Sequence, residues 1–399
     1  MHLPKKLTLG LFGFGVVGQG LLDIISSKNL NLSIKKIGIK HPEKQRTLSA
    51  ELFTTNPDEI INDPEIDTVV ELINDADAAY ELVKRSLLAG KSVVSANKKL
   101  IAEHLPELIS LAEETGKSFL YEGAACASIP IIRNLEEYYD NELLHEIRGI
   151  VNGSSNYILS KIYQEQMTYH AALKQAQDLG FAETDPLLDV GGYDPKFKLS
   201  IIAAHAYGLI VDPAQIFNYG IQYLSADDIR FSTEKGVRIK LVARAIPAEQ
   251  HAISLFVMPA FVTAEEPLYQ VENEYNGVVI QAAFADRQFF YGKGAGGHPT
   301  GSAVLSDIAA LRYDYRYEYK KYHTLKQHLT LKTDQQICIY LRYEHEQLVE
   351  ALQFDEIIER FNNRKFKYVM GLISLEKLIA NREKLLTPDV FLCEASVLT

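Results

Sequence analysis

Short apolar runs alternate with amphipathic helical segments through the first third of the chain. Runs bounded by glycine or polar residues are typical of strands, whereas apolar residues spaced three or four apart indicate helices. The pattern predicts helices at residues 19–26 and 76–89, and strands at residues 7–12, 34–39, 67–73 and 92–96. Because strands that alternate with helices form parallel sheets covered on both faces, we predict a doubly wound sheet here.

The pattern changes twice further along the chain. From residue 143 strands interleave with amphipathic helices, as at residues 147–151, 157–164 and 169–179, which indicates a second α/β domain. From about residue 322 we predict a helix at residues 354–361 and strands at residues 337–343, 368–373 and 390–393. The expected fold class is α/β, with an N-terminal Rossmann sheet, a second α/β substrate and dimerisation domain, and a small α+β module. The expected domains span residues 1–135, completed by a returning segment near 298–320, then residues 136–297, and residues 325–399.

A glycine-rich turn joins the first predicted strand to the first helix. It runs from Gly13 through Gly15 to Gly18, with Val16 and Val17 between the last two glycines. In a dinucleotide-binding turn the first glycine permits the tight turn, the second lets a pyrophosphate approach the backbone, and the third lets the helix pack closely on the strand. The motif is weak alone, but its strand-turn-helix setting favours a nicotinamide cofactor over a purely structural turn.

The second predicted strand ends at Lys40, where an acidic residue would bind the ribose 2′-hydroxyl of NAD. This favours NADP as the cofactor. The alternative is that Lys40 is a surface charge and that Glu43 reaches the ribose, so NADP and NAD both stay open. Ligands of doubly wound sheets bind beyond the carboxyl ends of the strands, which adds Asn74, Asn97 and Lys98 to the predicted site.

A loop with three carboxylates and a lysine opens another predicted helix; these residues are Asp185, Asp189, Asp194 and Lys198. Asp194 followed by Pro195 is an N-cap and first-turn signature, and an apolar helix at residues 199–207 continues from it. The helix dipole disfavours an ammonium at this end while the carboxylates favour it, so the protonation of Lys198 can be tuned as a general base requires. The alternative is a solvated lysine that pairs with Asp194 at i, i+4 spacing.

Two further loops lie at helix starts. Residues 152–157 follow a strand and offer hydroxyl and N–H groups that suit a carboxylate, although simple helix capping explains them too. Residues 291–302, which include Gly296, combine many glycines with a following helix at residues 303–311. This second loop predicts an anion or cofactor contact, and a mobile connection is the alternative.

Composition narrows the class of protein. Asp and Glu outnumber Lys and Arg by 52 to 41, and the formal charge of -11 argues against nucleic acid and against an anionic membrane surface as partners. No apolar run approaches the roughly 20 residues of a membrane helix, and no secretion signal precedes the first strand, so we expect a cytoplasmic protein. Three scattered cysteines fit a reducing compartment and are expected to be buried thiols, namely Cys126, Cys338 and Cys393.

Five separated segments occur in the order found in one enzyme family, so that the chain resembles the monofunctional homoserine dehydrogenases over roughly residues 7–315. The segments are the glycine turn and residues 94–99, 151–159, 179–198 and 292–300. The resemblance implies NAD(P)-dependent interconversion of L-homoserine and L-aspartate 4-semialdehyde, in the route to threonine, methionine and isoleucine. It also implies a homodimer or a larger homo-oligomer.

The resemblance implies roles for individual residues as well. Lys198 matches the lysine proposed to take the hydroxyl proton, and Lys98 matches a second active-site lysine near the nicotinamide. The residues implied to surround the substrate are Glu183, Asp189, Asp194, Gly153 and Ser154. The family binds a monovalent cation, usually sodium, through backbone carbonyls in a loop that matches Glu122, Ala125 and Ala127.

The chain departs from the family pattern at several positions. Phe181 stands where many relatives have tyrosine, which removes one hydroxyl contact to the substrate, and residues 126–128 replace a glycine-rich run in the cation loop. Residues 325–399 resemble a shortened ACT domain, so an amino-acid effector such as threonine is a further expectation. Two alternatives stay open: another NAD(P)-dependent oxidoreductase of a small amino or hydroxy acid, and a non-catalytic nucleotide or amino-acid sensor.

Overall fold

The structure is a computed structural model that describes residues 5–28, 30–46, 48–140, 143–248, 252–325 and 329–398. The chain divides into two compact units, and each is described by itself. Unit 1 comprises residues 1–140, 204–210 and 293–324. Unit 2 comprises residues 141–203, 211–292 and 325–399, so the C-terminal segment groups with the second unit.

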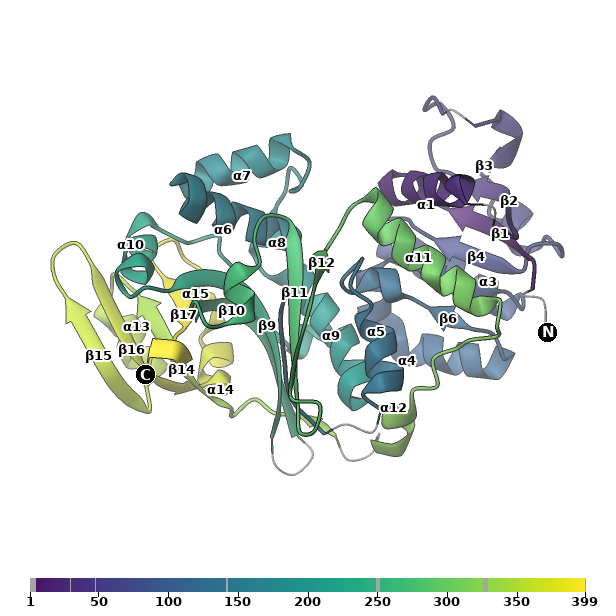
Figure 1. Ribbon diagram of the computed structural model, residues 1–399. Helices are drawn as coiled ribbons and strands as arrows, with labels where there is room; N and C mark the ends of the chain where they lie inside the picture. Colours follow the sequence, from purple (N-terminus) through teal and green to yellow (C-terminus); the bar gives the residue numbers. More distant parts are fainter. Residues whose placement is uncertain are drawn as a thin grey trace. The chain divides into compact units, whose positions relative to one another are not determined.

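Unit 1 is built on a six-stranded parallel sheet (Figure 1). The strands lie in the order β3-β2-β1-β4-β5-β6, which is the order of a Rossmann sheet. The predicted doubly wound sheet is therefore confirmed. The strands are β1 (Leu7–Phe12), β2 (Leu32–Gly38), β3 (Phe53–Thr54), β4 (Thr68–Glu71), β5 (Ser92–Ser95) and β6 (Phe119–Leu120).

Helices cover both faces of this sheet, and for that reason every residue of β4 is buried. Helices α1 and α11 pack against each other on one face, and α3 and α4 lie together on the other (Figure 1). The helices of this unit are α1 (Val16–Ser27), α2 (Asp58–Ile61), α3 (Ala76–Leu88), α4 (Lys98–Thr115), α5 (Ile131–Arg133), α11 (Gly297–Leu311) and α12 (Lys320–Leu325).

Unit 2 contains a larger, mostly antiparallel sheet in the order β12-β11-β7-β9-β10-β17-β14-β16-β15, with β8 and β13 paired to β10. Its first strands are β7 (Leu144–Ile150), β8 (Phe217–Asn218), β9 (Arg238–Ala248), β10 (Ala252–Val262), β11 (Tyr275–Ala282) and β12 (Arg287–Lys293). The C-terminal segment adds β13 (Thr330–Leu331), β14 (Gln336–Arg342), β15 (Glu356–Asn362), β16 (Lys367–Ser374) and β17 (Phe391–Glu394). The strands of residues 325–399 thus continue the sheet of unit 2, and a regulatory role for this segment stays a prediction.

The helices of unit 2 connect and cover these strands. They are α6 (Gly153–Glu165), α7 (Tyr169–Asp178), α8 (Leu187–Val190), α9 (Tyr193–Tyr207, whose last four residues are counted with unit 1), α10 (Ala226–Glu234), α13 (Glu346–Leu352), α14 (Leu375–Ala380) and α15 (Arg382–Leu385). Helix α6 packs on β9 and β11 and against α7.

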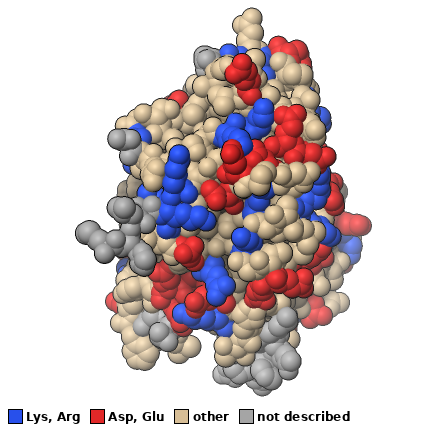
Figure 2. All heavy atoms as spheres, turned by 90° about the vertical axis from the view of Figure 1, so that its right-hand side faces the viewer, with Lys and Arg blue, Asp and Glu red and all other residues tan. Residues whose placement is uncertain are grey.

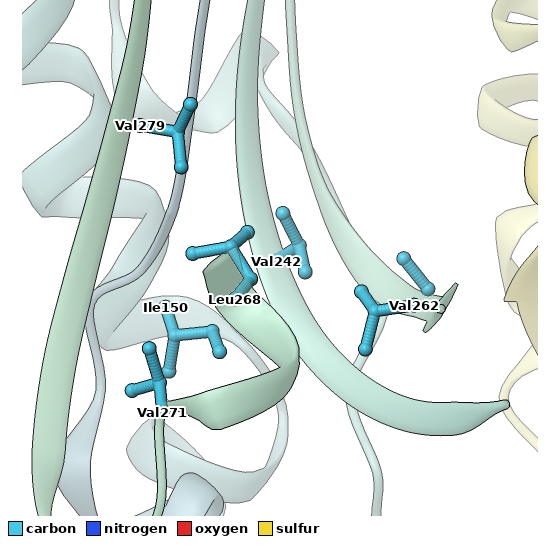
Figure 3. Packing of buried hydrophobic residues seen from close by; sticks show 7 residues of the cluster. Ile150, Val242, Val262, Leu268, Val271 and Val279 are labelled. Carbon is cyan, nitrogen blue, oxygen red and sulfur yellow. The ribbon is translucent and has the colours of Figure 1, made fainter. Parts of the chain in front are cut away.

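A cluster of branched aliphatic side chains forms one part of the core of unit 2 (Figure 3). Its members come from β7, β9, β10 and β11 and from the short 3-10 helix Pro267–Gln270 with the residue that follows it. They are Ile150, Val242, Ala260, Val262, Leu268, Val271 and Val279. Burial of each large side chain of this kind stabilises a fold by roughly 1.5–3 kcal/mol, so the cluster fixes the strands that carry the loops of the site.

The predicted helix at residues 354–361 is wrong, because these residues form the edge strand β15. Their apolar residues, Phe354, Ile357, Ile358 and Phe361, have the spacing of a helix face. The chain instead pairs antiparallel with β16, and a register shift between Ile357 and Glu359 absorbs Ile358 as an extra residue. Strand pairing with the next segment of the chain therefore overrides the local periodicity.

Helix α9 begins earlier than predicted. It starts at Tyr193, so Asp194 and Pro195 lie in its first turn and Asp194 is not the N-cap. The preceding residue, Gly192, has φ +79°, which glycine adopts without strain. The helix ends before Gly208, as predicted, at a position with φ +76°.

One face of the molecule carries charges of both signs, and the thiols lie inside. On the face shown in Figure 2, Lys and Arg are interspersed with Asp and Glu, and neither sign forms a continuous field. All three cysteines are buried thiols that form no disulfide, as predicted. Among the described helices, none combines the length and the apolar composition that crossing a bilayer requires.

Candidate active site

The glycine turn of unit 1 has the geometry of a phosphate-binding turn. Gly13 has φ +100°, and a Cβ atom there would lie 2.6 Å from the carbonyl oxygen of Leu72. A Cβ atom at Gly18 would lie 2.8 Å from the carbonyl oxygen of Gly13. Both positions therefore require glycine for packing, whereas a Cβ atom at Gly15 would meet nothing within 4 Å. The space beside Gly15, at the start of α1, fits the approach of a pyrophosphate.

The two glycine loops of the sequence meet in this unit. Helix α11 begins at Gly297, where a Cβ atom would lie 2.8 Å from the carbonyl oxygen of Val16, the first residue of α1. Its N-cap, Gly296, has φ +119°, a conformation that glycine adopts most easily. Two helix N-termini therefore point their N–H groups at one region, which increases the attraction for an anion.

Close packing of α1 and α11 depends on glycines at the contact. A Cβ atom at Gly20 would lie 2.4 Å from the carbonyl oxygen of Gly297, and one at Gly301 would lie 2.8 Å from the backbone nitrogen of Leu21. Larger residues at either position would force the helices apart. The sequence predicts each loop, but only the fold shows that they share one site.

The predicted residues at the carboxyl ends of β4 and β5 lie on short polar connections. Asn97 is the N-cap of α4: its Oδ1 accepts a hydrogen bond from the Leu100 N–H at 3.1 Å, and its Nδ2 donates to the Ile73 carbonyl at 3.0 Å. Lys98 is the first residue of α4 and is half-buried, whereas Asn74 is exposed. These positions agree with the rule that placed them at the end of the sheet.

Sequence reasoning missed Glu71, the last residue of β4, which is fully buried. Its carboxylate accepts hydrogen bonds from the Ser95 hydroxyl and the Ile73 N–H, both at 2.6 Å. Burial raises the pKa of Glu71 from 4.5 to about 7, and these two hydrogen bonds offset only part of that effect.

We expect the pKa of Glu71 to make unfolding depend on pH. Between pH values of about 4.5 and 7 the folded protein holds a proton that the unfolded chain releases, so the free energy of unfolding falls as the pH rises, by roughly 3 kcal/mol in all. Glu71→Gln should flatten this dependence in denaturant titrations at pH 5.5 and 8. Glu81→Gln, at an exposed position of α3, is the control. An equal change in the free energy of unfolding between pH 5.5 and 8 in wild type and Glu71→Gln would contradict the prediction.

A cleft of about 440 Å³ opens near the carboxyl end of β2, where the ribose of a dinucleotide binds in this fold. Lys44 and Arg46 line it. The Arg46 guanidinium donates to the carbonyls of Lys44 and His41 at 2.7 and 2.8 Å, so the loop orients it. Glu43, the residue that the alternative interpretation places at the ribose, pairs its carboxylate with His41 at 3.1 Å. Lys40 is exposed.

Unit 2 places Lys198 and Asp194 together in a buried cluster. The Lys198 ammonium lies 2.9 Å from Asp194 Oδ2 and donates to the Val151 carbonyl at 2.7 Å. Only 7% of Lys198 and 5% of Asp194 is exposed. The i, i+4 pair of the alternative interpretation exists, but it is not a solvated surface pair. Because burying two charges is costly, the arrangement indicates a use beyond helix stability.

Asn152 joins the acidic residues of the loop, and sequence reasoning assigned it no such role. Its Nδ2 donates to Asp189 Oδ1 at 2.7 Å and to Asp194 Oδ2 at 2.9 Å. Its Oδ1 accepts from the Ser155 N–H at 2.8 Å as the N-cap of α6. One buried amide thus caps a helix and holds two carboxylates side by side.

The other predicted substrate residues lie around this cluster. Gly153 opens α6, and a Cβ atom there would lie 2.7 Å from the Glu274 carbonyl oxygen, so the close approach of that backbone requires glycine. The Ser154 hydroxyl donates to the Phe181 carbonyl. Glu183 has an exposed side chain, and its backbone carbonyl accepts from Gln177 at 3.0 Å. The structure therefore joins Asp189, Asp194 and Lys198 and leaves Glu183 at the surface of unit 2.

The predicted cation loop follows β6 in unit 1. The Glu122 carboxylate accepts from the N–H groups of Ile132 and Arg133 at 2.9 and 3.0 Å, and the Glu122 N–H donates to Asp307 at 2.8 Å. Burial and the nearby Asp307 raise the pKa of Glu122 to about 7. Ala127 has φ +46°, a conformation that non-glycine residues seldom adopt. The Arg133 guanidinium pairs with Asp307 at 2.8 Å, so both buried carboxylates already have partners, and a cation at this loop stays a prediction.

Two family models match the chain. The model described as homoserine dehydrogenase, NAD binding domain, matches residues 13–122, and the model described as homoserine dehydrogenase matches residues 130–309. The homoserine dehydrogenase of Bacillus subtilis (strain 168) is 36% identical over 322 residues, which cover 78% of this chain and 74% of the relative.

Solved structures agree with the family models. A homoserine dehydrogenase from Thiobacillus denitrificans has a TM-score of 0.83 and 29% identity, with 98% of both chains covered. A hyperthermophilic archaeal homoserine dehydrogenase mutant in complex with NADPH has a TM-score of 0.67 and 27% identity, covering 79% of this chain and 100% of that one. These matches favour the dehydrogenase over the other oxidoreductase and over the non-catalytic sensor. The chain therefore belongs to the homoserine dehydrogenase family and is an NAD(P)-dependent oxidoreductase that acts on a CH–OH group.

Proposed function

We propose that the chain interconverts L-homoserine and L-aspartate 4-semialdehyde and that Lys198 transfers the hydroxyl proton. The observation that carries this assignment is the buried pair of Lys198 and Asp194, held together with Asn152 after strand β7. When bound at the glycine turn, the nicotinamide cofactor accepts a hydride from the alcohol carbon. The hydride can leave readily only if a base takes the alcohol proton.

The proton passes between the substrate oxygen and the Lys198 Nζ. In oxidation a neutral Lys198 accepts the hydroxyl proton as the C–H bond breaks and the aldehyde C=O bond forms. In reduction the hydride adds to the aldehyde carbon. The Lys198 ammonium, which Asp194 stabilises, returns the proton to the aldehyde oxygen. We assign Lys98, at the N-terminus of α4, to the same oxygen, in line with the family resemblance.

The acidic residues of unit 2 are assigned to the substrate ammonium. Asp189 and Asp194, which Asn152 holds together, supply the negative charge, and Glu183 adds to it. The N-terminus of α6, at Gly153 and Ser154, is assigned to the substrate carboxylate, because its N–H groups and dipole favour an anion.

A nicotinamide absorbance assay tests the reaction. Purified protein should oxidise L-homoserine with NADP or NAD and reduce L-aspartate 4-semialdehyde in the reverse direction. A panel of other small amino and hydroxy acids should give no comparable rate. The same assay in sodium and in a bulky organic cation tests the cation at Glu122, Ala125 and Ala127. Protein that binds the cofactor but oxidises none of these alcohols would contradict the proposal.

We expect NADP to be the preferred cofactor, because Lys44 and Arg46 line the cleft near the end of β2 and Lys40 lies in the same loop. Charge-assisted hydrogen bonds to a 2′-phosphate contribute about 1.5–3 kcal/mol. Arg46→Ala should therefore raise the KM for NADP by about 10- to 100-fold and leave the KM for NAD within about two-fold. Arg85→Ala, which removes an arginine paired with Asp58 on α2, is the control. Equal effects on both cofactors would contradict this assignment.

We propose further that the protein acts in the cytoplasm as a homodimer or larger homo-oligomer, and that residues 325–399 bind an amino-acid effector. The family resemblance supports these points. Light scattering and activity with added threonine test the assembly and the effector.

A further inference from the structure

Arg382, the first residue of α15, contacts the turn that leads into α9. Its Nη2 atom lies 3.2 Å from the Tyr193 hydroxyl oxygen and 3.1 Å from Asn218 Oδ1. Its guanidinium carbon is 5.9 Å from the centre of the Tyr193 ring. Tyr193 immediately precedes Asp194, so a residue of the C-terminal segment contacts the chain one position from the proposed site.

Asn218 extends this contact to the backbone. Its side chain is buried, and its Nδ2 donates to the Gly191 carbonyl at 2.8 Å. The adjoining residues leave little space for the turn to move, because the Ile221 N–H donates to the Val190 carbonyl at 2.7 Å and a Cβ atom at Gly220 would lie 1.8 Å from that oxygen. Arg382 thus holds Tyr193 directly and Gly191 through Asn218.

The turn is also held by a residue that precedes it in the chain. Asn152 bonds to Asp189 and to Asp194, which flank residues 190–193. Lys198 in turn takes its position from Asp194 at 2.9 Å. Any movement of Tyr193 along its helix therefore changes where Asp194 meets the Lys198 ammonium.

We propose that Arg382 is a positioning residue for turnover, which fixes the 191–193 turn and through it Asp194 and Lys198. This inference rests on the proposed function of Lys198. It gives residues 325–399 a physical route to the chemistry, because the guanidinium is contributed by that segment. A displacement of about 1 Å in a reacting group lowers turnover by about 100-fold, so a small shift of the turn is enough.

Steady-state kinetics of the full chain test the proposal. Arg382→Ala should lower kcat by about 10- to 100-fold and leave the KM for the cofactor within about two-fold. Arg382→Lys should recover part of the activity, since a single ammonium cannot reproduce the planar fork of the arginine.

Two further variants separate positioning from general stability. Tyr193→Phe keeps the ring and removes the hydroxyl acceptor, and its effect should be less than additive with that of Arg382→Ala. Arg360→Ala is the matched control, because Arg360 lies in the same segment and bonds to Tyr343 and Glu346 but not to the turn. It should keep kcat within about two-fold.

The outcomes are distinguishable. If Arg382→Ala and Tyr193→Phe both keep the wild-type kcat while Lys198→Ala is inactive, the positioning role is wrong and the proposed function stands. If Lys198→Ala retains activity, the proposed function fails first. A lower melting temperature in Arg382→Ala with kcat at its wild-type value would show that Arg382 is only a structural contact. If Arg382→Ala does not fold, Arg382→Lys and Tyr193→Phe decide the question.

Discussion

Lys198→Ala is expected to lower kcat by about 1,000- to 10,000-fold with little change in the KM for the cofactor. The expected loss is that of a general acid–base group, because Lys198 is the residue assigned to carry the hydroxyl proton. The measurement is the rate of nicotinamide reduction with L-homoserine, compared with wild type at several pH values. A variant that retains most of its activity would refute the assignment of Lys198.

The control for Lys198 must separate chemistry from the loss of an ion pair. Lys161→Ala serves this purpose, since Lys161 lies on α6 of the same unit and forms an i, i+4 pair with Glu165 at 2.6 Å. It should keep kcat within about two-fold. Lys198→Met, which retains most of the buried side-chain volume, checks that the loss in Lys198→Ala does not come from a cavity. Circular dichroism of each variant confirms the fold.

Asp194→Ala is expected to lower kcat/KM by about 100- to 1,000-fold and to destabilise the protein. The change leaves the Lys198 ammonium buried without its carboxylate partner, which costs about 3–5 kcal/mol, and it removes an acceptor for Asn152. Activity and thermal unfolding are measured on the same preparation. A variant that loses only thermal stability would show that Asp194 is a structural residue of the helix start.

Asp194→Asn separates charge from shape in this position. An asparagine still accepts a hydrogen bond from Asn152 but leaves the Lys198 ammonium without a carboxylate, so only part of the stability should return while the activity stays low. Asp178→Ala is the control, because Asp178 forms an exposed i, i+4 pair with Lys174 on α7 and should be neutral in both measurements. Recovery of full activity in Asp194→Asn would show that the negative charge at this position is not needed.

The parallel sheet of unit 1 was predictable from local sequence. Its strands are short apolar runs whose ends carry glycine or polar residues, and the predicted strand at residues 7–12 agrees with β1. The glycine turn was predictable for the same reason, since Gly18 packs against Gly13 within one strand-turn-helix unit, although Gly13 also lies close to Leu72 after β4. Local rules were sufficient because each of these elements has its own pattern within a short stretch of sequence.

The features that sequence reasoning missed depend on contacts with other segments, which the local pattern of residues does not show. Asn152 lies at the start of a helix, and the residues next to it in the chain do not show that its amide reaches Asp189 and Asp194. Arg382 reaches Tyr193 across most of the second half of the chain. β15 was predicted as a helix because its pairing with β16, which decides the conformation, is not visible in the spacing of its apolar residues.

The return of residues 293–324 to unit 1 has a consequence for how the protein is made. α1 is covered by α11, and their contact requires Gly20 and Gly301, which lie far apart along the chain. The strands of the nucleotide-binding sheet therefore leave the ribosome long before α11 does. The apolar stripe of α1 stays uncovered during most of translation. Contacts between such distant segments form slowly, and we expect newly made chains to depend on chaperones until α11 closes over α1.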